Sequence, residues 1–376
     1  MNNNNDLRTY TLELYEKDRE WAFNVNSILK VSYTEYMGLK LPLMLVTVKA
    51  LDGVLQAITV GQKIEMELKI RGFTYKYKME IIDLRSIQSV TDPKGVSTLH
   101  DLTISAIFNY EELVKSLGIK AYKNSIKKTL ESLGVDVGES ISDKIGDQTW
   151  LRANKSKKYM FRKLITHLFL GEKDCPVSAI TQDWIKVRSL QEVMKKEPLR
   201  VANYGISDPK YLQVQVQGLN TSNATLLKKV RSDAVTMVVD KVHNNIKVLD
   251  YNGKEIDKAF GTEFKTDRKI ASVNKTFIDC GNCYEDYYKA YIRNKTAWIG
   301  LQSESTYLKV PDPFSANFEV LDTLEIKTID RGSKFKGTWV VSEVGFTLYP
   351  TIKEVKGYVK VDKIPEEYYK LQGVKK

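Results

Sequence analysis

The chain of 376 residues is 42% hydrophobic and 10% aromatic, which excludes a disordered protein and allows two or three domains that each bury a core. It has no run of 18 apolar residues, and its first residues, MNNNNDLRTY, lack the features of a secretory signal, so we expect a cytosolic product without a membrane segment. A net charge of +11 means that an acidic partner such as nucleic acid has to be considered.

Residues 10 to 90 alternate apolar and polar positions in the manner of β-strands, separated by turn residues such as Gly38, Gly61 and Gly72. The segment KIEMELKI at 63 to 70 places four apolar side chains on one face and charged side chains on the other. Several such strands in so short a stretch predict a small barrel or sandwich within residues 1–108. The four apolar residues are Ile64, Met66, Leu68 and Ile70.

Residues 109–195 change to helical spacing and predict a mixed, mostly helical domain. In NSIKKTLESLG, Asn124 or Ser125 can cap a helix that Gly134 ends. The next helix carries an apolar stripe, and two clusters of basic residues, at 154–163 and 194–200, lie on or beside the helical segments. The stripe consists of Phe161, Leu164, Ile165 and Leu168.

Strand patterns resume at 196–220, where YLQVQVQGL alternates strictly, and continue through 286–362. Between them we expect an α+β insertion at 221–285, with a hairpin turn at Asn252 and Gly253. We expect residues 363–376 to form a C-terminal tail. A tyrosine stripe at helical spacing is expected to pack in a core or subunit interface and consists of Tyr284, Tyr287, Tyr288 and Tyr291.

A short internal repeat relates the two strand-rich regions. The segment VLDTLEIK at 320–327 aligns with VGQKIEME at 60–67, and each is followed about fifteen residues later by a second apolar strand. One matched strand pair is weak evidence alone, because alternating strands resemble each other by chance. The aligned residues are Val320 with Val60, Leu324 with Ile64, Glu325 with Glu65, and Ile326 with Met66.

The sequence predicts no catalytic, cofactor-binding or metal-ligating residue, and we expect that the protein is not an enzyme. His100, His167 and His243 have no metal-ligand spacing, and His167 falls within the apolar stripe of its helix, where a packing role is expected. Three cysteines, Cys175, Cys280 and Cys283, are too few for a disulfide framework. Cys280 and Cys283 have the spacing of a redox motif or of half a zinc site, but the sequence has neither a thioredoxin-like fold pattern nor a second cysteine pair.

Several stretches, in order along most of the chain, resemble the baseplate hub protein of contractile-tailed bacteriophages, which is related to the hubs of other contractile injection systems. These stretches are DLTISAIFNYEELVKSLGIKAYKNSIKKTLESLG at 101–134, TWLRANKSKKYMFRKLITHLFL at 149–170, YYKAYIRNKTAWIGLQS at 287–303 and FKGTWVVSEVGFTLYPT at 335–351. Residues 220 to 280 match least.

The resemblance implies an α+β, mainly β chain with two tail-tube-type β-barrels and an inserted mixed, partly helical region. The apolar faces of the second barrel would be filled by side chains such as Val340, Val344 and Phe346. It implies a homotrimeric, pseudo-hexameric ring in the virion baseplate, assembled in the host cytoplasm.

The implied partners are the tail tube, central spike and tape measure proteins, with baseplate wedge proteins as further candidates and DNA only in transit through the lumen. Two alternatives remain at this point. A basic nucleic-acid-binding protein is favoured by the net charge and the cluster at 154–163. A glycosidase or peptidase domain of a tail has only scattered carboxylates behind it.

Overall fold

The computed structural model is dominated by β-strands, with short α-helices gathered in the middle of the chain. No helix in the part of the chain it describes is long and apolar enough to cross a membrane. It describes residues 10–16, 19–22, 25–51, 56–70, 73–91, 98–108, 111–116, 118–142, 147–152, 154–170, 174–182, 185–204, 212–213, 215–220, 234–240, 245–250, 274–280, 294, 298, 301, 304–310, 317–328, 333–352 and 354–363.

The first array is a run of six antiparallel strands. In spatial order they are β3 (Ile28–Met37), β4 (Leu43–Leu51), β7 (Thr98–Phe108), β6 (Phe73–Thr91), β5 (Lys63–Ile70) and β1 (Tyr10–Glu16), and β2 (Arg19–Ala22) pairs antiparallel with the end of β1. Three residues of the predicted face of β5, Ile64, Met66 and Leu68, are buried in a first core, as period-two alternation requires. That core includes Ile64, Met66, Leu68, Val31, Val46, Met79, Ile81 and Ile104.

The middle region contains the predicted helices. Its elements are α2 (Glu111–Val114), β8 (Lys120–Asn124), α3 (Ile126–Ser132), β9 (Asp136–Val137), β10 (Gln148–Arg152), α4 (Lys157–His167), β11 (Pro176–Ile180), β12 (Ile185–Ser189) and α5 (Leu190–Lys195). β8 pairs with β10, and β12 pairs with β11 and β9. The whole stripe of α4 is buried in a middle core, so this helix prediction is confirmed.

Local chemistry sets the ends of these helices. The Ser125 hydroxyl accepts a hydrogen bond from the Lys128 backbone N–H at the start of α3, and Ser156 caps α4 in the same way. Gly134 follows α3 with a φ of +84°, a left-handed conformation that costs glycine little. The cap and stop residues expected from the sequence are therefore confirmed.

The second array repeats the strand order of the first. It runs β15 (Gln215–Asn220), β19 (Ser305–Val310), β22 (Glu354–Lys363), β21 (Gly337–Tyr349), β20 (Thr323–Thr328) and β13 (Arg200–Tyr204), and β14 (Leu212–Gln213) pairs with β13. One difference is that β13 is parallel to β20, whereas β1 is antiparallel to β5. The second core consists of Ala202, Leu308, Val310, Phe318, Leu324, Ile326, Trp339, Val341, Val359 and Val361.

The internal repeat expected from the sequence holds residue by residue in the two hairpins. Ile64 lies opposite Met79 in β5 and β6, and Leu324 lies opposite Trp339 in β20 and β21, so both positions differ by 260. The two long strands also carry a bulge at matched places, between Ile81 and Asp83 and between Val341 and Glu343. A chance likeness of alternating strands would not reproduce register and bulge together.

The turns that enter the two hairpins share a hydrogen-bond pattern. The Gly61 N–H donates to the Ile81 carbonyl at 2.8 Å, and the Leu321 N–H donates to the Val341 carbonyl at 2.9 Å. Both residues have positive φ, +93° at Gly61 and +78° at Leu321. The conformational cost at a leucine is offset by burial of its side chain. The repeat therefore lies in backbone geometry more than in residue identity.

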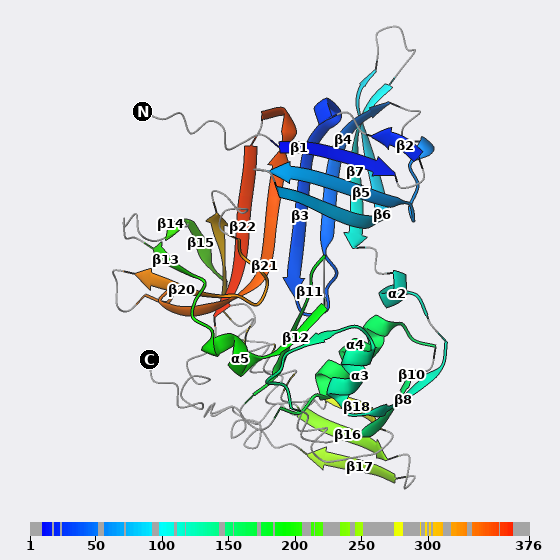
Figure 1. Ribbon diagram of the computed structural model, residues 1–376, viewed down its shortest axis with the longest axis vertical. Coiled ribbons are helices and arrows are strands. Elements are labelled where there is room, and N and C mark those ends of the chain that lie inside the picture. Colours follow the sequence, from blue (N-terminus) through cyan, green and yellow to red (C-terminus); the bar gives the residue numbers. More distant parts are fainter. Residues whose placement is uncertain are drawn as a thin grey trace.

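Figure 1 shows the two arrays side by side, with the long strands β3, β21 and β22 between them and the helices below. A separate sheet of β16 (Ala234–Asp240), β17 (Asn245–Asp250) and β18 (Asn274–Cys280) lies at the bottom of this view. The predicted turn at Asn252 and Gly253 and the tyrosine stripe at 284–291 lie outside the described residues.

Two expectations are corrected. Val340 does not share a face with Phe346, because the bulge after Val341 shifts the alternation by one residue. Val340 packs instead in a junction core with α5, while Val344 is only partly buried. Where the sequence has the YLQVQVQGL pattern, the structure has β14, which pairs with β13, and β15, which pairs with β19. The mainly β character is confirmed. The middle region is mixed and partly helical, with five described strands among its helices, rather than mostly helical as expected. Closure of each array into a barrel stays a prediction.

Candidate functional site

The residues with the most reactive chemistry do not converge in the described part of the chain, where no group of three or more His, Cys, Asp and Glu side chains could hold a metal ion. His167 is buried in α4 and its Nδ1 donates to the Lys163 carbonyl at 2.6 Å. Burial lowers its pKa to about 4, so it is a neutral packing histidine, as expected. Cys175 is a buried free thiol, while His243 and Cys283 lie outside the described residues.

The most distinctive feature is a seam where one array joins the other. The first half of β21 pairs with β20, whereas its second half, Glu343–Leu348, pairs with Val31–Tyr36 of β3. β22 runs along the opposite edge of both halves. A single 13-residue strand therefore belongs to both arrays. The pairing of β21 with β3 cannot be predicted from sequence periodicity, which reports only which residues of a strand share a face.

One face of the seam is apolar. The Phe346 ring of β21 lies 5.7 Å from the Tyr33 ring of β3 and 6.1 Å from the Tyr77 ring of β6, measured between centroids. Tyr33 and Tyr77 are 4.5 Å apart. These tilted contacts stabilise aromatic clusters. With Leu348, Phe346 brings side chains of the second array into the first core, which ties the folding of the two arrays together.

The other face of the seam is polar. Ser32 and Thr347 are hydrogen-bonded across it at 3.0 Å. The Tyr358 hydroxyl of β22 reaches over Gly345 to Thr34 of β3, with an oxygen–oxygen distance of 2.6 Å. A Cβ at position 345 would lie 2.4 Å from the Tyr358 ring, so only glycine leaves room for this contact. Three adjacent strands are thereby linked by one side chain.

Two acidic groups lie near this polar face. Burial raises the pKa of Glu343, and Lys360 and Lys40 partly oppose the shift. Burial also raises the pKa of Asp362 on β22 to about 6, against the opposing charge of Lys360. Such groups keep a proton more readily than exposed carboxylates do, which lowers the cost of placing them between packed strands.

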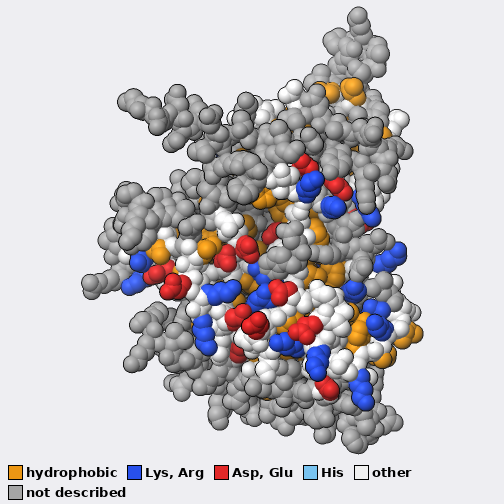
Figure 2. All heavy atoms as spheres, in the orientation of Figure 1, with side chains coloured by type: hydrophobic (Ala, Val, Ile, Leu, Met, Phe, Trp, Pro, Cys, Tyr) orange, Lys and Arg blue, Asp and Glu red, His pale blue; other side chains and the backbone are white. Residues whose placement is uncertain are grey.

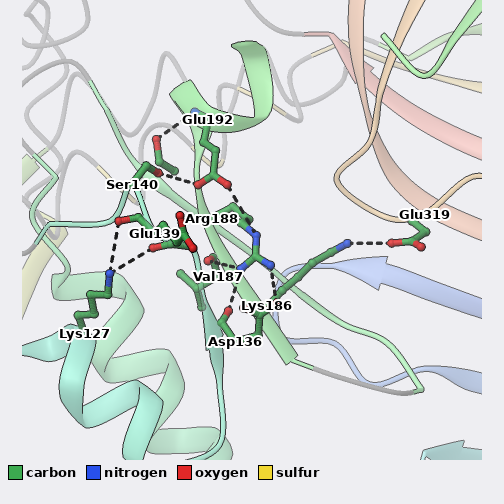
Figure 3. A network of polar contacts seen from close by, with 11 residues as sticks. Lys127, Asp136, Glu139, Ser140, Lys186, Val187, Arg188, Glu192 and Glu319 are labelled. Atoms are coloured by element: carbon green, nitrogen blue, oxygen red, sulfur yellow. Dashed lines mark hydrogen bonds and ion pairs between the residues drawn. The ribbon is translucent and has the colours of Figure 1, made fainter. Parts of the chain in front are cut away.

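A network of charged contacts joins the middle region to the second array (Figure 3). Arg188 of β12 forms ion pairs with Asp136 and Glu192. The neighbouring Lys186, whose pKa burial lowers despite the opposing effect of Glu319, lies 3.4 Å from that carboxylate. Glu319 belongs to the turn that precedes β20, where its N–H donates to the Asp322 carboxylate. The pair of Lys186 with Glu319 is therefore the contact by which this network reaches the second array.

A basic pocket of about 590 Å³ lies between α4 and the end of β3. Its described lining includes Lys40, Lys158 and Arg162 and no acidic side chain. Burial and the charge of Arg162 lower the pKa of Lys158. The pocket can accept an anionic group, and it collects part of the basic cluster expected from the sequence at 154–163.

The surface charge is otherwise mixed. Figure 2 shows Lys and Arg side chains interspersed with Asp and Glu across the described part of this face, rather than a continuous basic area. Broad, sequence-independent binding to nucleic acid uses a basic stripe or groove. The described surface in this view therefore favours local contacts with partners over a track for a phosphate backbone.

No family model matches the sequence, and no curated protein matches it significantly. Solved structures do match over nearly the whole chain. A tail protein from Neisseria meningitidis has 10% identity and a TM-score of 0.52, with 94% of this chain and 96% of that one covered. The 43 kDa tail protein of prophage MuSo2 from Shewanella oneidensis has 11% identity and a TM-score of 0.51, with 96% and 98% covered.

A third structure is the c3393 protein of E. coli, described as a component of the type VI secretion system that resembles the T4 bacteriophage tail proteins gp27 and gp5. It has 9% identity and a TM-score of 0.51, with 94% of this chain and 78% of that chain covered. At this level of identity the comparisons show a shared fold. That fold is consistent with the resemblance indicated by the sequence.

Proposed function

We propose that this chain, which has the fold of bacteriophage tail proteins, is the central hub of a contractile-tail baseplate. The observation that carries the proposal is the duplication: two arrays with the same strand order, hairpin register, entry turn and bulge. The similarity of the whole chain to tail proteins supports it.

Duplication suits a protein that joins two symmetries. A tail tube built from hexameric rings and a threefold spike cannot meet directly through equivalent contacts. A homotrimer of a duplicated chain offers six near-equivalent arrays to the tube and three equivalent chains to the spike. In this proposal each array closes as a tube-like barrel, and the ring leaves a lumen for the tape measure protein and DNA.

The proposed role is structural rather than enzymatic. The ring binds tail tube protein on one face and spike protein on the other, and wedge proteins of the baseplate contact its outside. In this proposal the middle region, which contacts the second array through the ion pair of Lys186 with Glu319, presents such an outer surface. The basic pocket beside α4 offers one local contact for an acidic group of a partner.

The direct test is the solution mass of the purified protein by light scattering, at low and high salt, with and without short duplex DNA. We expect a stable species near three times 43.1 kDa that is insensitive to DNA. A monomer that binds DNA with strong salt dependence would instead support the alternative function, a basic nucleic-acid-binding protein, because each phosphate contact releases a counterion. That alternative rests on the net charge of +11 and on the basic pocket.

A second test addresses the remaining cysteine pair. Replacing both Cys280 and Cys283 with Ser should leave the trimer mass unchanged, because the proposed hub needs no metal or redox centre. Zinc released from the purified wild-type protein on denaturation, or loss of the folded protein in the double variant, would contradict this part of the proposal.

A further inference from the structure

The basic pocket beside α4 holds more positive charge than the described residues around it balance. Lys40, Lys158 and Arg162 line the pocket, and none of them forms an ion pair with a described carboxylate. The causes that lower the pKa of Lys158 are burial and the charge of Arg162, and no acidic group opposes them. Glu343 and Lys40 influence each other's charge, but from more than ion-pair distance. The described lining therefore leaves this positive charge without a close counter-charge.

The start of α4 adds to this imbalance. Its first turn carries Lys157 and Lys158 and no acidic residue. The N-terminal end of a helix has a partial positive charge, so acidic residues are favoured there and lysines are unfavourable. Where a sequence breaks such a local rule, a functional contact is the expected reason. The charges on both sides of the pocket therefore indicate an anionic ligand.

The walls of the pocket restrict the kind of anion. Met37, Leu39, Val177 and Trp298 give it apolar surface. The Trp298 ring is fixed in place, because its Nε1–H donates to the Pro176 carbonyl at 2.7 Å. The volume of about 590 Å³ lies in the range of pockets that enclose a ligand. Cations beside apolar and aromatic walls suit a carboxylate with aromatic neighbours better than a bare phosphate group.

The C-terminal tail of this chain has that chemistry. After Lys363 the sequence reads IPEEYYKLQGVKK, in which Glu366 and Glu367 directly precede Tyr368 and Tyr369. The two carboxylates complement the three cations of the pocket, and the two aromatic rings complement its apolar walls. Residues 364–376 lie outside the described residues, so the argument for their position rests on charge and on reach.

The tail begins close enough to reach the pocket. Lys363, the last described residue of β22, donates its backbone N–H to the Glu304 carbonyl at 2.8 Å. Glu304 is six residues from Trp298 in the pocket wall, and six residues span at most about 22 Å. Tyr369 lies six residues beyond Lys363 in the other direction along the chain. The tail can therefore cover the whole distance that the segment 298–304 can cover.

We propose that the segment EEYY at 366–369 binds in the basic pocket of its own chain, with its carboxylates on Lys40, Lys158 and Arg162 and its tyrosine rings against the apolar walls. This contact ties the end of β22, in the second array, to α4 in the middle region. A partner with an acidic group then has to displace the tail. The inference does not depend on the proposed hub, because it concerns groups of a single chain.

The test is zero-length cross-linking of the full-length protein with a carbodiimide, which couples a carboxylate to an amine that it contacts, followed by digestion and mass spectrometry. We expect a cross-link between the EEYY segment and Lys158 or Lys40. The ion pair of Lys76 with Glu67, 3.0 Å apart, supplies a reference cross-link within the first array. In an equal mixture of isotope-labelled and unlabelled protein, the cross-link should join only peptides with the same label.

Two charge reversals make the test specific. Arg162→Glu changes an exposed residue of the pocket that cannot itself be coupled, and should lower the yield of the tail cross-link about tenfold, because attraction turns into repulsion. Lys128→Glu is the matched control: it makes the same change of charge at an exposed position of α3 outside the pocket, and should leave the yield unchanged. The reference cross-link should persist in both variants, which shows that they are folded.

Several outcomes would overturn the proposal. Equal yields in the two variants would mean that the pocket does not hold the tail. Cross-links between labelled and unlabelled peptides would assign the pocket to the tail of a second copy. A cross-link of the pocket lysines to another carboxylate, such as Glu285 or Asp286 in YEDYY at 284–288, would identify a different occupant, and no cross-link where the reference forms would leave none. None of these results changes the mass by light scattering, so this inference and the proposed hub can fail separately.

Discussion

The contact between Gly345 and Tyr358 gives the sharpest test of the internal seam. In an ordinary strand, Gly→Ala stabilises a protein by roughly 0.5–1 kcal/mol, because alanine loses less backbone freedom on folding. At Gly345 the same substitution should destabilise the protein instead. A Cβ there would lie 2.4 Å from Cζ and 2.5 Å from the hydroxyl oxygen of Tyr358, so the ring has to move.

The magnitude follows from what that movement disrupts. Moving the ring breaks the 2.6 Å hydrogen bond to Thr34, whose net contribution is about 1 kcal/mol, and strains a packed site at a cost of about 1–3 kcal/mol. After the gain from alanine is subtracted, Gly345→Ala should destabilise the protein by about 2 kcal/mol. In a Tyr358→Ala background the obstacle is gone, and Gly345→Ala should be neutral or stabilising.

The assay is urea unfolding of the four proteins of this cycle at one fixed protein concentration, since any assembly makes stability depend on concentration. Tyr358→Phe is the matched control: it removes the hydroxyl but keeps the ring atoms that oppose a Cβ, so Gly345→Ala should still destabilise it. Equal effects of Gly345→Ala with and without the Tyr358 ring would refute the reasoning.

Three further predictions concern stability. Burial raises the pKa of Asp362 from 3.8 to about 6, so the folded state binds this proton more tightly than the unfolded state does. The protonated group therefore contributes its full stability below pH 4, and this contribution is lost as the pH rises through 6. Asp362→Asn should therefore gain about 2 kcal/mol relative to wild type between pH 4 and pH 7, measured as the difference of two urea titrations. A difference that does not depend on pH would contradict the assignment. Phe161→Ala in the middle core should lower the free energy of unfolding by about 3–5 kcal/mol. The control Tyr159→Ala, at an exposed position of the same helix, should lower it far less. Similar shifts of the urea midpoint in both variants would mean that the buried face of α4 is wrongly assigned. Ser125→Ala should cost about 1 kcal/mol by removing the cap of α3, checked by thermal unfolding, and an unchanged melting temperature would count against the cap.

The two arrays share their core positions but differ in residues outside the core. The core positions of the two hairpins match across the repeat, while residues further along the long strands differ, as at Phe346 and Ser86, which are 260 positions apart. Hydrophobic burial tolerates many substitutions of similar volume, whereas edge pairing and charged pockets depend on a few exposed residues.

Local patterns in the sequence determined the elements. Alternation predicted the buried face of β5, because side chains of a strand point to opposite sides in turn, and helical spacing predicted the stripe of α4. The alignment of Leu324 with Ile64 identified the repeat, since paired hairpins of the same register keep the same apolar positions. These signals lie within one or two neighbouring strands.

Only the tertiary structure decided what lies further apart. The pairing of β21 with β3 joins residues more than 300 positions apart, and the bulge after Val341 moved Val340 to the opposite face from the one expected. No pattern within a strand records which strand lies beside it, because backbone hydrogen bonds are the same for every residue type. The contact of the Tyr358 side chain with Thr34 over Gly345 likewise forms only when strands from distant parts of the chain meet. The burial of Asp362 also depends on the strands that pack around it.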